Sequence, residues 1–554
     1  MSTITVGKYG LEYRGRYDPY LIEQIKQVPG RRYDPRRKIW HLPVSSEVLR
    51  LVEDMPQISL APEARAVIQR KEEAALMIQA VKEHERPEPT KPMPIKVAPF
   101  AHQVRGFNLG VTLDSAGILM EQGCGKSLTA VAIAGRRFLD GQVNRVLVVA
   151  PLSVLPVWQR EFRDYADYPH EVRLLRGGSM DKRIEMLAAF PEDALKIAAI
   201  NYESVWREEM FKALLKWRPD MIICDESQKI KGPSTKQSKG LHKLGEIAKY
   251  KLILTGTPVS NSPMDFFSQY KFLNPNIFGR SFWAFRSRYA VMGGYKNKQV
   301  VGYQNKAELV RKAHSIAYRV TKAEALDLPE TIDQELYCKL EPQAAKHYSD
   351  MKKHNVAEIE AEEQIIATNV LTRLLRLQQI TGGFLPKGED TDKQVQVSKA
   401  KLSLLADVLE DLIGAGKKVV IFARFRAEIA EIEKIIAGLG DYRAITGSVS
   451  MDERGQAVED FQKDPGVKTF IAQIQTAGLG ITLTAADTGI FYSLDFSYAN
   501  YEQAKARLHR IGQVSKVTYL HLLAQDTVDE RVYDVLKQKK SVVDDVVDNW
   551  RKYF

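Results

Sequence analysis

Short runs that are apolar at every position recur through two long stretches of the chain. In residues 99–275 the runs VLVVAP, IAAIN, MIICDE and LILTGT alternate with segments of helical periodicity. The same alternation returns after residue 401 with KVVIFAR, KTFIAQI and TGIFYS. Such continuous runs are typical of strands that are buried on both faces of a parallel sheet. The pattern predicts an α/β fold with two parallel-sheet domains, whose chemistry lies at the carboxyl ends of the strands.

The N-terminal segments follow other patterns. Residues 1–55 alternate strand-like pieces with the helical pattern DPYLIEQIKQV, which predicts a small α+β module. Residues 62–85 predict one charged, Ala-rich helix. The five prolines of HERPEPTKPMPIKVAP end that helix, because proline cannot continue one. A semi-rigid linker and a domain boundary are therefore expected near residues 86–98.

The segment between the two α/β stretches is aromatic and basic at first, and strongly helical from about residue 341 to residue 380. We expect helical insertions there, followed by the charged connector GEDTDKQVQVSK, and a helical tail at the end of the chain. The predicted segments are 1–55, 56–98, 99–275, 276–400, 401–525 and 526–554.

The composition indicates which kind of partner and which cellular compartment to expect. The chain of 554 residues is long enough for roughly three to four domains. Its net charge of +11 indicates a polyanionic partner, and residues 1–50 hold ten Lys or Arg against five Asp or Glu. Three cysteines without metal-site spacing favour a reducing compartment. The sequence shows neither a signal-peptide core nor a long apolar run, so we expect a cytosolic protein without a membrane span.

Basic and aromatic residues alternate in RRYDPRRKIWHLP, near the N-terminus. Cations grip a phosphate backbone, and aromatic rings stack on bases or sugars. The alternative is a solvated basic turn with the tryptophan in a small core. The candidate nucleic-acid contacts are Arg31, Arg32, Arg36, Arg37, Lys38 and Trp40.

The stretch AGILMEQGCGKSLTAVAIA contains a glycine-bracketed turn between an apolar run and a helical pattern. Gly123 and Gly125 let backbone N–H groups approach an anion, and the helix that follows adds positive potential. Lys126 can reach the outer phosphates of a nucleotide, and the Ser127 hydroxyl suits Mg²⁺. The strict P-loop pattern would have glycine where this chain has Met120, so an ordinary strand-to-helix turn is the alternative.

Two further groups of residues suit phosphoryl transfer. Asp225 and Glu226 end the run MIIC, where one carboxylate can hold Mg²⁺ through water and the other can polarise the attacking water. Gln503, Arg507 and Arg510 recur at helical spacing and are expected to share one helix face. Arginines from a second domain can stabilise the charge on a transferred phosphoryl group. The alternative for them is an exposed basic helix face.

Taken in order, the motifs of residues 99–540 resemble those of superfamily 2 helicase-like ATPases of the Swi/Snf branch. FAHQVRG matches the Q-motif, EQGCGKS motif I, APLSVLPVWQREF motif Ia, DESQ the DEAH box, LTGTP motif III and VVIFARF motif IV. TAGLGITLTAAD, with Gly478 and Gly480, matches motif V, and HRIGQ is the hallmark of motif VI in this branch. The N-terminal pieces DPYLIEQIKQV and RRYDPRRKIWHLP resemble the HARP domain of annealing helicases.

The resemblance implies two RecA-like domains that hydrolyse ATP at their interface. In the first domain, Gln103 would read the adenine, Lys126 would bind the β- and γ-phosphates, and Ser127 would bind Mg²⁺. Asp225 would hold Mg²⁺ through water, and Glu226 would be the general base. From the second domain, Arg507 and Arg510 would complete the site in cis, and Gln503 would link it to DNA.

Some positions depart from the family pattern. Gln228 replaces the usual His of the box, which puts the coupling between the ATP and DNA sites in question. The customary GLNLT reads GITLT, DWNP reads DFSY, and Ala506 replaces the usual Asp before the first arginine of motif VI. These changes point to a divergent viral or bacterial member of the family, in the cytoplasm or associated with a nucleoid.

The function that the sequence predicts is an ATP- and Mg²⁺-dependent motor that translocates on duplex or branched DNA and remodels or reanneals it, acting as a monomer. Two alternatives stay open. One is an ATP-gated DNA clamp with weak hydrolysis, and the other is an RNA-directed helicase of the same superfamily. The sequence has no aromatic RNP strings, which favours DNA over RNA as the substrate. It has no chromatin-reading appendage, which disfavours a role on chromatin.

Overall fold

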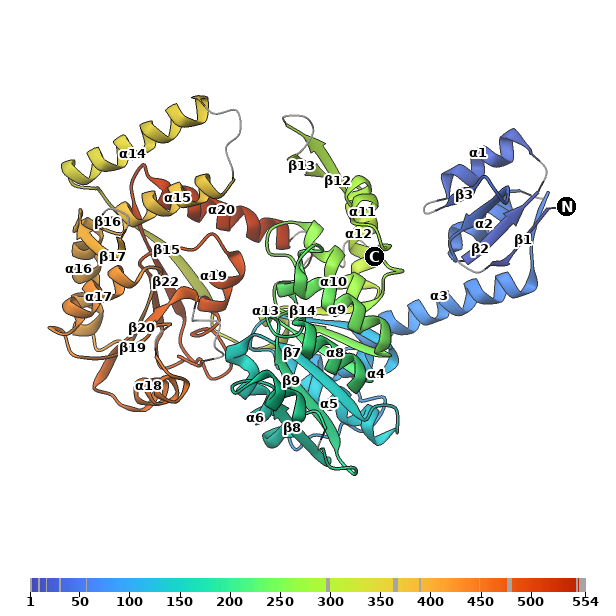
Figure 1. Cartoon of the computed structure of the whole chain (residues 1–554), viewed down its shortest axis with the longest axis horizontal. Helices are drawn as coiled ribbons and strands as arrows, with labels where there is room; N and C mark the ends of the chain where they lie inside the picture. The colour runs from blue at the N-terminus through green and yellow to red at the C-terminus, as the bar shows by residue number, and fades with distance from the viewer. Residues whose placement is uncertain are drawn as a thin grey trace. The chain divides into compact units, whose positions relative to one another are not determined.

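The fold is described from a computed structural model (Figure 1). It forms two compact units, Met1–Pro87 and Glu88–Phe554, which we describe one at a time. The residues that the structure describes are 2–7, 10–15, 17–28, 31–55, 57–188, 190–294, 299–361, 367–387, 390–447, 449–475, 481–544 and 547.

The N-terminal unit is the predicted α+β module. Its five-stranded sheet has the order β3-β4-β2-β1-β5, antiparallel except for the pair β1/β5. Pro19 opens helix α1, and the Asp18 side chain accepts hydrogen bonds from the N–H groups of Tyr20 and Leu21. The elements are β1 Ser2–Gly7, β2 Gly10–Arg14, α1 Pro19–Gln27, β3 Arg32–Asp34, β4 Ile39–Leu42, α2 Ser46–Asp54, β5 Ile58–Leu60 and the expected charged helix α3 Pro62–Glu83.

The first large sheet is parallel throughout and seven strands wide, in the order β14-β6-β11-β10-β7-β9-β8. All residues of β10 are buried, as its continuous apolar run predicts. The strands are β6 Ser115–Met120, β7 Arg145–Ala150, β8 His170–Leu174, β9 Leu195–Asn201, β10 Met221–Asp225, β11 Tyr250–Leu254 and β14 Ala317–Val320. The helices are α4 Ala101–Thr112, α5 Lys126–Leu139, α6 Leu155–Tyr165, α7 Met180–Glu185, α8 Glu208–Trp217, α9 Lys236–Ile247 and α10 Phe266–Leu273. We call this part the first lobe.

The second large sheet is also parallel throughout and has six strands, in the order β15-β22-β21-β18-β20-β19. Its strands are β15 Thr331–Cys338, β18 Val419–Ala423, β19 Asp441–Ile445, β20 Val467–Gln473, β21 Thr488–Phe491 and β22 Val517–Ala524. Its helices are α16 Ala400–Gly414, α17 Arg426–Ile436, α18 Met451–Lys463, α19 Tyr498–Lys505 and the C-terminal α20 Val528–Val543. We call this part the second lobe. The two sheets confirm the predicted fold class.

The segment 276–400 contains strands as well as the expected helices. Within it β14 joins the edge of the first sheet beside β6, and β15 joins the edge of the second beside β22. The expected charged connector is largely strand, since β17 pairs with β16 as a hairpin. These segments become strands because they hydrogen-bond to a neighbouring strand. Their sequences show no continuous apolar run, because polar residues are tolerated at the edge of a sheet. The elements not yet given are α11 Phe282–Tyr289, β12 Ala290–Gly293, β13 Gln299–Tyr303, α12 Lys306–His314, α13 Lys322–Ala325, α14 Pro342–Ala361, α15 Ala367–Thr381, β16 Phe384–Lys387 and β17 Asp390–Gln396.

Among the described residues, no helix is both long and apolar enough to cross a bilayer.

Candidate active site

The loop between β6 and α5 has the geometry of a phosphate cradle. Gly123 and Gly125 have φ angles of 87° and 78°, a region that L side chains rarely adopt. Gly125 is also the N-cap of α5, and no side chain caps that helix end. A Cβ atom on Gly125 would lie 2.1 Å from Nε2 of Gln103. The glycines therefore allow both the turn and the close approach, and they leave the first amides of α5 open to an anion.

Helix α4 packs against this loop through its first turn. The N–H of Phe100 donates to Oε1 of Gln103 at 3.0 Å, and Nε2 of Gln103 donates to the carbonyl of Cys124 at 3.4 Å. His102 Nε2 lies 2.8 Å from the same carbonyl, and burial lowers the pKa of that histidine. Gln103 thus lies at the cradle, where its sequence match places it, while its role in reading adenine stays a prediction.

Lys126 and Ser127 begin helix α5. The Nζ of Lys126 donates to the carbonyls of Met120 and Glu121, at 3.1 and 3.3 Å, so its charge lies over the loop. Ser127 is half-buried in the first turn of the helix. An ammonium group, a hydroxyl group and open helix amides together form a donor set that matches a polyphosphate with its Mg²⁺.

Asp225 lies at the carboxyl end of β10 and is 6% exposed. The indole N–H of Trp158 donates to its Oδ2 at 3.0 Å, and the N–H of Glu226 donates to its Oδ1 at 3.0 Å. Burial and the neighbouring Glu226 charge raise the pKa of Asp225, while the charge of Lys126 acts in the opposite direction. The carboxyl is therefore fixed in orientation and close enough to Lys126 to be affected by its charge.

Glu226 is joined to the first sheet through the glutamine that replaces the usual histidine. Nε2 of Gln228 donates to Oε2 of Glu226 at 2.7 Å, and the hydroxyl of Thr255 donates to Oε1 of Gln228 at 2.7 Å. The N–H of Thr257 donates in turn to the Thr255 hydroxyl at 3.0 Å. This chain of hydrogen bonds connects the carboxylate to the turn that follows β11, so Gln228 retains a physical link between the two motifs.

The helical arrangement expected for Gln503, Arg507 and Arg510 is wrong. Helix α19 ends at Lys505, so Gln503 lies on it, half-buried, whereas both arginines lie in the turns that follow. The carbonyl of Arg507 accepts a hydrogen bond from the N–H of Leu483. The side chain of Gln513 donates to the carbonyl of Leu508. The N–H groups of Arg507 and Leu508 donate to the carbonyls three residues back, Ala504 and Lys505, so the chain tightens into turns after Lys505.

Both arginines nevertheless lie against the first lobe. A Cβ atom on Gly123 would lie 3.4 Å from Cβ of Arg510. Burial raises the pKa of Glu161 to about 7, and the charge of Arg510 acts against that rise. Arg507 is 7% exposed, and burial together with the neighbouring Arg510 lowers its pKa to about 10. The charge of Glu226 acts in the opposite direction on Arg507. The structure therefore brings two cations of the second lobe to the cradle and the carboxylate pair of the first.

Lys322, which the sequence analysis did not single out, connects the two lobes at this point. Its backbone N–H donates to Oε2 of Glu121 at 2.6 Å, and its Nζ donates to the carbonyl of His509 at 2.8 Å. The side chain is 7% exposed, and burial lowers its pKa. Lys322 lies in a segment expected to be an insertion, and no local pattern marks it, because only the fold brings β14 next to the cradle.

A cavity of about 300 Å³ adjoins these contacts and is lined from both lobes, for example by Glu121, Gln122 and Thr257 of the first and Glu502 and Lys505 of the second. Within the described ranges, the side-chain nitrogen and oxygen of Gln122 and the hydroxyl of Thr257 are buried without hydrogen-bond partners. Buried polar atoms beside a cradle fit a polar ligand, because leaving them unpaired is costly.

No cluster of three or more His, Cys, Asp or Glu that could hold a metal occurs in the part of the chain that the structure describes. Mg²⁺ in nucleotide sites needs only one or two protein ligands, since phosphate oxygens and water supply the others. Asp225 and Ser127 remain compatible with that chemistry.

The basic residues of the N-terminal unit lie around the turn between β3 and β4. The rings of Tyr33 and Trp40 are 5.0 Å apart, and Trp40 is half-buried against the small core. Arg37 lies 3.5 Å from the Glu12 carboxylate. These contacts match the alternative of a basic turn in solvent with Trp40 on the small core, and nucleic-acid contact stays a prediction. The exposed members of the predicted set are Arg31, Arg32, Arg36, Arg37 and Lys38.

Gly478 and Gly480 of the glycine-rich motif lie outside the described residues.

Comparison with known proteins gives similarities over most of the chain. Residues 102–382 match the SNF2-related domain, and residues 400–512 match the helicase conserved C-terminal domain. The mouse chromodomain-helicase-DNA-binding protein 1-like is 28% identical over 441 residues, which cover 77% of this chain and 47% of that protein. The mouse DNA annealing helicase and endonuclease ZRANB3 is 28% identical over 432 residues, covering 76% of this chain and 38% of that protein.

A solved structure, the SWI2/SNF2 ATPase core of Sulfolobus solfataricus in complex with dsDNA, is 27% identical with a TM-score of 0.41, and the match covers 83% of this chain and 95% of that one. The chain spans less than half the length of the curated relatives named above. Both matched domains begin after residue 101, so the HARP-like character of the N-terminal unit stays a prediction.

Proposed function

This chain belongs to the SNF2-related domain family, and from that membership we propose that it is a DNA-stimulated ATP hydrolase that translocates on duplex or branched DNA and remodels or reanneals it. One observation carries the proposal. The cradle of the first lobe and the arginines of the second lie together, with Arg510 beside Gly123 and Arg507 near enough for its pKa to respond to Glu226.

In the proposed reaction the open amides of α5 and the ammonium group of Lys126 bind the phosphates of ATP. The hydroxyl of Ser127 and, through water, the carboxyl of Asp225 would hold Mg²⁺, which would neutralise charge on the phosphate oxygens. Glu226 accepts a proton from the attacking water, and Gln228 fixes the position of that carboxylate through its 2.7 Å hydrogen bond. Arg507 and Arg510 stabilise the charge that develops on the transferred phosphoryl group.

Movement would follow from the same contacts. ATP draws the two arginines of the second lobe toward Lys126, and hydrolysis releases them, so each cycle closes and opens the two lobes. Gln228 and Thr255 provide a path by which the state of Glu226 reaches the turn after β11. If DNA is held across both lobes, repeated closure moves them along one backbone strand.

DNA is proposed as the substrate from charge and from the relatives. The relatives named above are a DNA-binding helicase and a DNA annealing helicase by name. The exposed basic turn around Arg36 and Arg37 offers phosphate contacts in the N-terminal unit. Such contacts carry little sequence information, so affinity should fall steeply with salt and vary little with sequence.

The test is steady-state ATP hydrolysis with single-stranded, duplex and forked DNA and with matched RNA. We expect stimulation by DNA, greatest for duplex or forked DNA, and loss of turnover in Glu226→Gln. If no DNA stimulates hydrolysis, the motor proposal fails. Strand annealing that survives in Glu226→Gln would instead indicate an ATP-gated clamp, and preferential stimulation by RNA would change the substrate class.

A further inference from the structure

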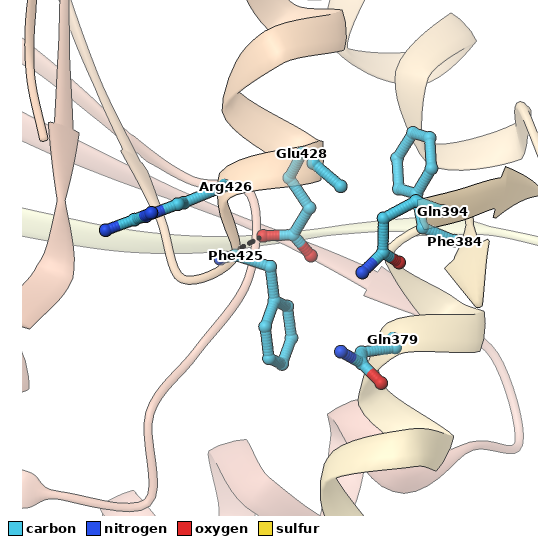
Figure 2. A pocket seen from close by; sticks show the side chains of 7 residues that line it. Gln379, Phe384, Gln394, Phe425, Arg426 and Glu428 are labelled. Carbon is cyan, nitrogen blue, oxygen red and sulfur yellow. Dashed lines mark hydrogen bonds between the residues drawn. The ribbon is translucent and has the colours of Figure 1, made fainter. Parts of the chain in front are cut away.

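The second lobe contains a cavity of about 370 Å³ at the start of α17. Figure 2 shows it between the start of α17, helix α15 and the hairpin β16–β17. None of the residues that line it belongs to the cradle, the carboxylate pair or the arginine turns. Six of them are Gln379, Phe384, Gln394, Phe425, Arg426 and Glu428.

One carboxyl oxygen of Glu428 is the reason to regard this cavity as a binding site. The residue is 1% exposed, and its Oε2 accepts hydrogen bonds from the N–H groups of Arg424 and Phe425, at 3.2 and 3.1 Å, and from the hydroxyl of Ser493 at 2.6 Å. Its Oε1 is buried without a hydrogen-bond partner among the described residues. Figure 2 shows that oxygen turned toward the side of the cavity where Gln394 and Gln379 lie. A buried acceptor left unpaired is costly, so a ligand that donates a proton to it would be favoured.

The surrounding chain is shaped to hold the carboxyl in this position. A Cβ atom on Gly382 would lie 2.1 Å from Oε1 of Glu428, so any larger residue there would displace the carboxyl group. The hydroxyl of Tyr492 donates to the carbonyl of Gly382 at 3.0 Å and fixes the glycine from the other side. Three donors on one oxygen and a glycine beside the other keep the free oxygen in one orientation.

The lining defines the chemistry of the ligand. Phe384 and Phe425 offer apolar ring surface, on which a flat heteroaromatic ring can stack. The oxygen of Gln379 accepts from Arg376 at 3.0 Å, so its –NH₂ group can serve a ligand, and Glu428 supplies an acceptor. The guanidinium of Arg426 is exposed at the edge of the cavity and points away from the carboxyl, where a phosphate could reach it. A flat ring with N–H donors, attached to a phosphate, satisfies all of these groups.

We propose that this cavity receives one unstacked nucleobase of a DNA strand, with an amino group of the base donating to Oε1 of Glu428. The inference rests on the proposed function, because it needs bound DNA. Adenine, cytosine and guanine carry an exocyclic amino group, whereas thymine offers only its ring N3–H, flanked by two carbonyl oxygens that would face the carboxyl group of Glu428. The cavity therefore predicts that a thymine at the captured position is bound more weakly than the other three bases.

The test uses the full chain and forked DNA with one unpaired nucleotide at the junction, which is A, C, G or T in otherwise identical strands. Affinities are measured by fluorescence anisotropy at one fixed salt concentration. We expect the fork with T to bind about tenfold more weakly than the other three, the size of one good polar contact to a base. Free cytidine is added in a parallel series to separate a base in a strand from a free nucleoside.

Two variants and a matched control test the role of the cavity. In Glu428→Gln the amide oxygen can keep the three donors, and the –NH₂ group then faces the cavity, so the preference against T should disappear or reverse. Ala427→Leu fills the cavity from its lining and leaves the carboxyl in place, so it should also remove the preference. Glu431→Gln, on the same helix and paired with Lys434, should behave as the wild type.

The outcomes separate this inference from the proposed function. If the wild type binds all four forks equally, or if both cavity variants keep the full preference, the cavity does not read a base. If free cytidine binds the wild type and this binding is lost in both cavity variants while all four forks bind equally, the ligand is a free nucleoside and the DNA inference fails. If the wild type binds no DNA, the proposed function itself fails.

Discussion

The two lobes each begin a helix directly after a buried strand, and they treat that helix end in opposite ways. In the first lobe, β6 leads through Gly123 and Gly125 into α5, whose first amides have no side-chain cap. In the second, β18 leads into α17, and Glu428 turns back to accept the N–H groups of Arg424 and Phe425. Helix N-termini attract negative charge in both cases. The second lobe supplies that charge from its own sequence, and the first leaves the position open to a phosphate.

This difference explains how similar sheets can have unequal roles. At the start of α17 the carboxyl group of Glu428 already accepts the N–H groups of Arg424 and Phe425, so fewer amides are open to an anion there than at the start of α5. The second lobe is instead proposed to contribute to ATP chemistry from a different place, the turns after α19 that carry Arg507 and Arg510. One lobe is thus proposed to bind the nucleotide, and the other to complete its site with cations.

The largest expected effect concerns Arg510. In Arg510→Ala the second lobe loses the cation beside the cradle, so we expect kcat for ATP hydrolysis to fall about 10³-fold, in the range of arginine fingers. Steady-state hydrolysis measures it, with the unfolding temperature as a check of folding. Arg443→Ala is the matched control, since Arg443 pairs with Asp460 on the same lobe. Equal losses in both variants would contradict the division of roles between the lobes.

The capped helix end predicts a pH dependence of stability. Burial raises the pKa of Glu428 from its ordinary value of 4.5 to about 7, so the folded protein holds this proton more tightly than the unfolded chain does. Raising the pH from about 4.5 through about 7 therefore lowers the free energy of unfolding, by up to about 3 kcal/mol from this group. Glu428→Gln should lose that part of the slope.

Urea unfolding of the wild type and of Glu428→Gln at about pH 5 and about pH 8 measures this effect. The change in the free energy of unfolding between the two pH values is compared between the two proteins. Glu431→Gln serves as the control on the same helix and should keep the slope of the wild type. A wild-type slope that survives unchanged in Glu428→Gln would mean that the carboxyl group does not titrate in this range.

The open helix end predicts a loss of activity when a side chain enters it. In Gly125→Ala the new Cβ atom would collide with Nε2 of Gln103, and the alanine would have to keep the positive φ of residue 125, so the cradle must shift. We therefore expect about a 10²-fold fall in kcat/KM for ATP. Gly141→Ala has a similar φ of 68° but nothing within 4 Å of its Cβ atom. That control carries the backbone strain alone, and normal hydrolysis in Gly125→Ala would show that the loop is not the cradle.

The smallest expected effect lies in the link between Glu226 and Thr255. In Gln228→Ala both 2.7 Å hydrogen bonds are lost, so stimulation of ATP hydrolysis by DNA should fall about tenfold, while turnover without DNA falls less. Gln228→His restores the usual family residue and should keep most of the stimulation. The ratio of rates with and without forked DNA measures the coupling, and an unchanged ratio in Gln228→Ala would exclude the link.

The sequence predicted what depends on local pattern. The continuous apolar runs gave β7, β9, β10 and β11 in the first sheet, because burial on both faces leaves no polar positions. The glycines, Lys126 and Ser127 lie where their motif indicates, since a cradle is built from neighbours in sequence. Edge strand β15, TIDQELYC, was missed because five of its eight residues are exposed.

What the sequence could not supply comes from contacts between distant residues. Lys322 lies at the cradle only because β14 pairs with β6, nearly two hundred positions earlier. Arg507 and Arg510 have helical spacing, yet the helix ends at Lys505, and the carbonyl of Arg507 pairs with the N–H of the distant Leu483. The free oxygen of Glu428 is invisible in the sequence, because a glutamate at the third position of a helix is usually a surface cap.

Residues 321–330 carry the chain from the last strand of the first sheet to the first strand of the second. Lys322 anchors the start of this connector to Glu121 on one side and to His509 on the other, so in the proposed motor the pivot between the lobes would lie beside the cradle. A rotation about a pivot moves nearby atoms little and distant atoms far. A shift of an ångström or so at the cradle would therefore become a stride several times longer at the outer ends of the lobes, and this short lever converts a chemical event into mechanical travel.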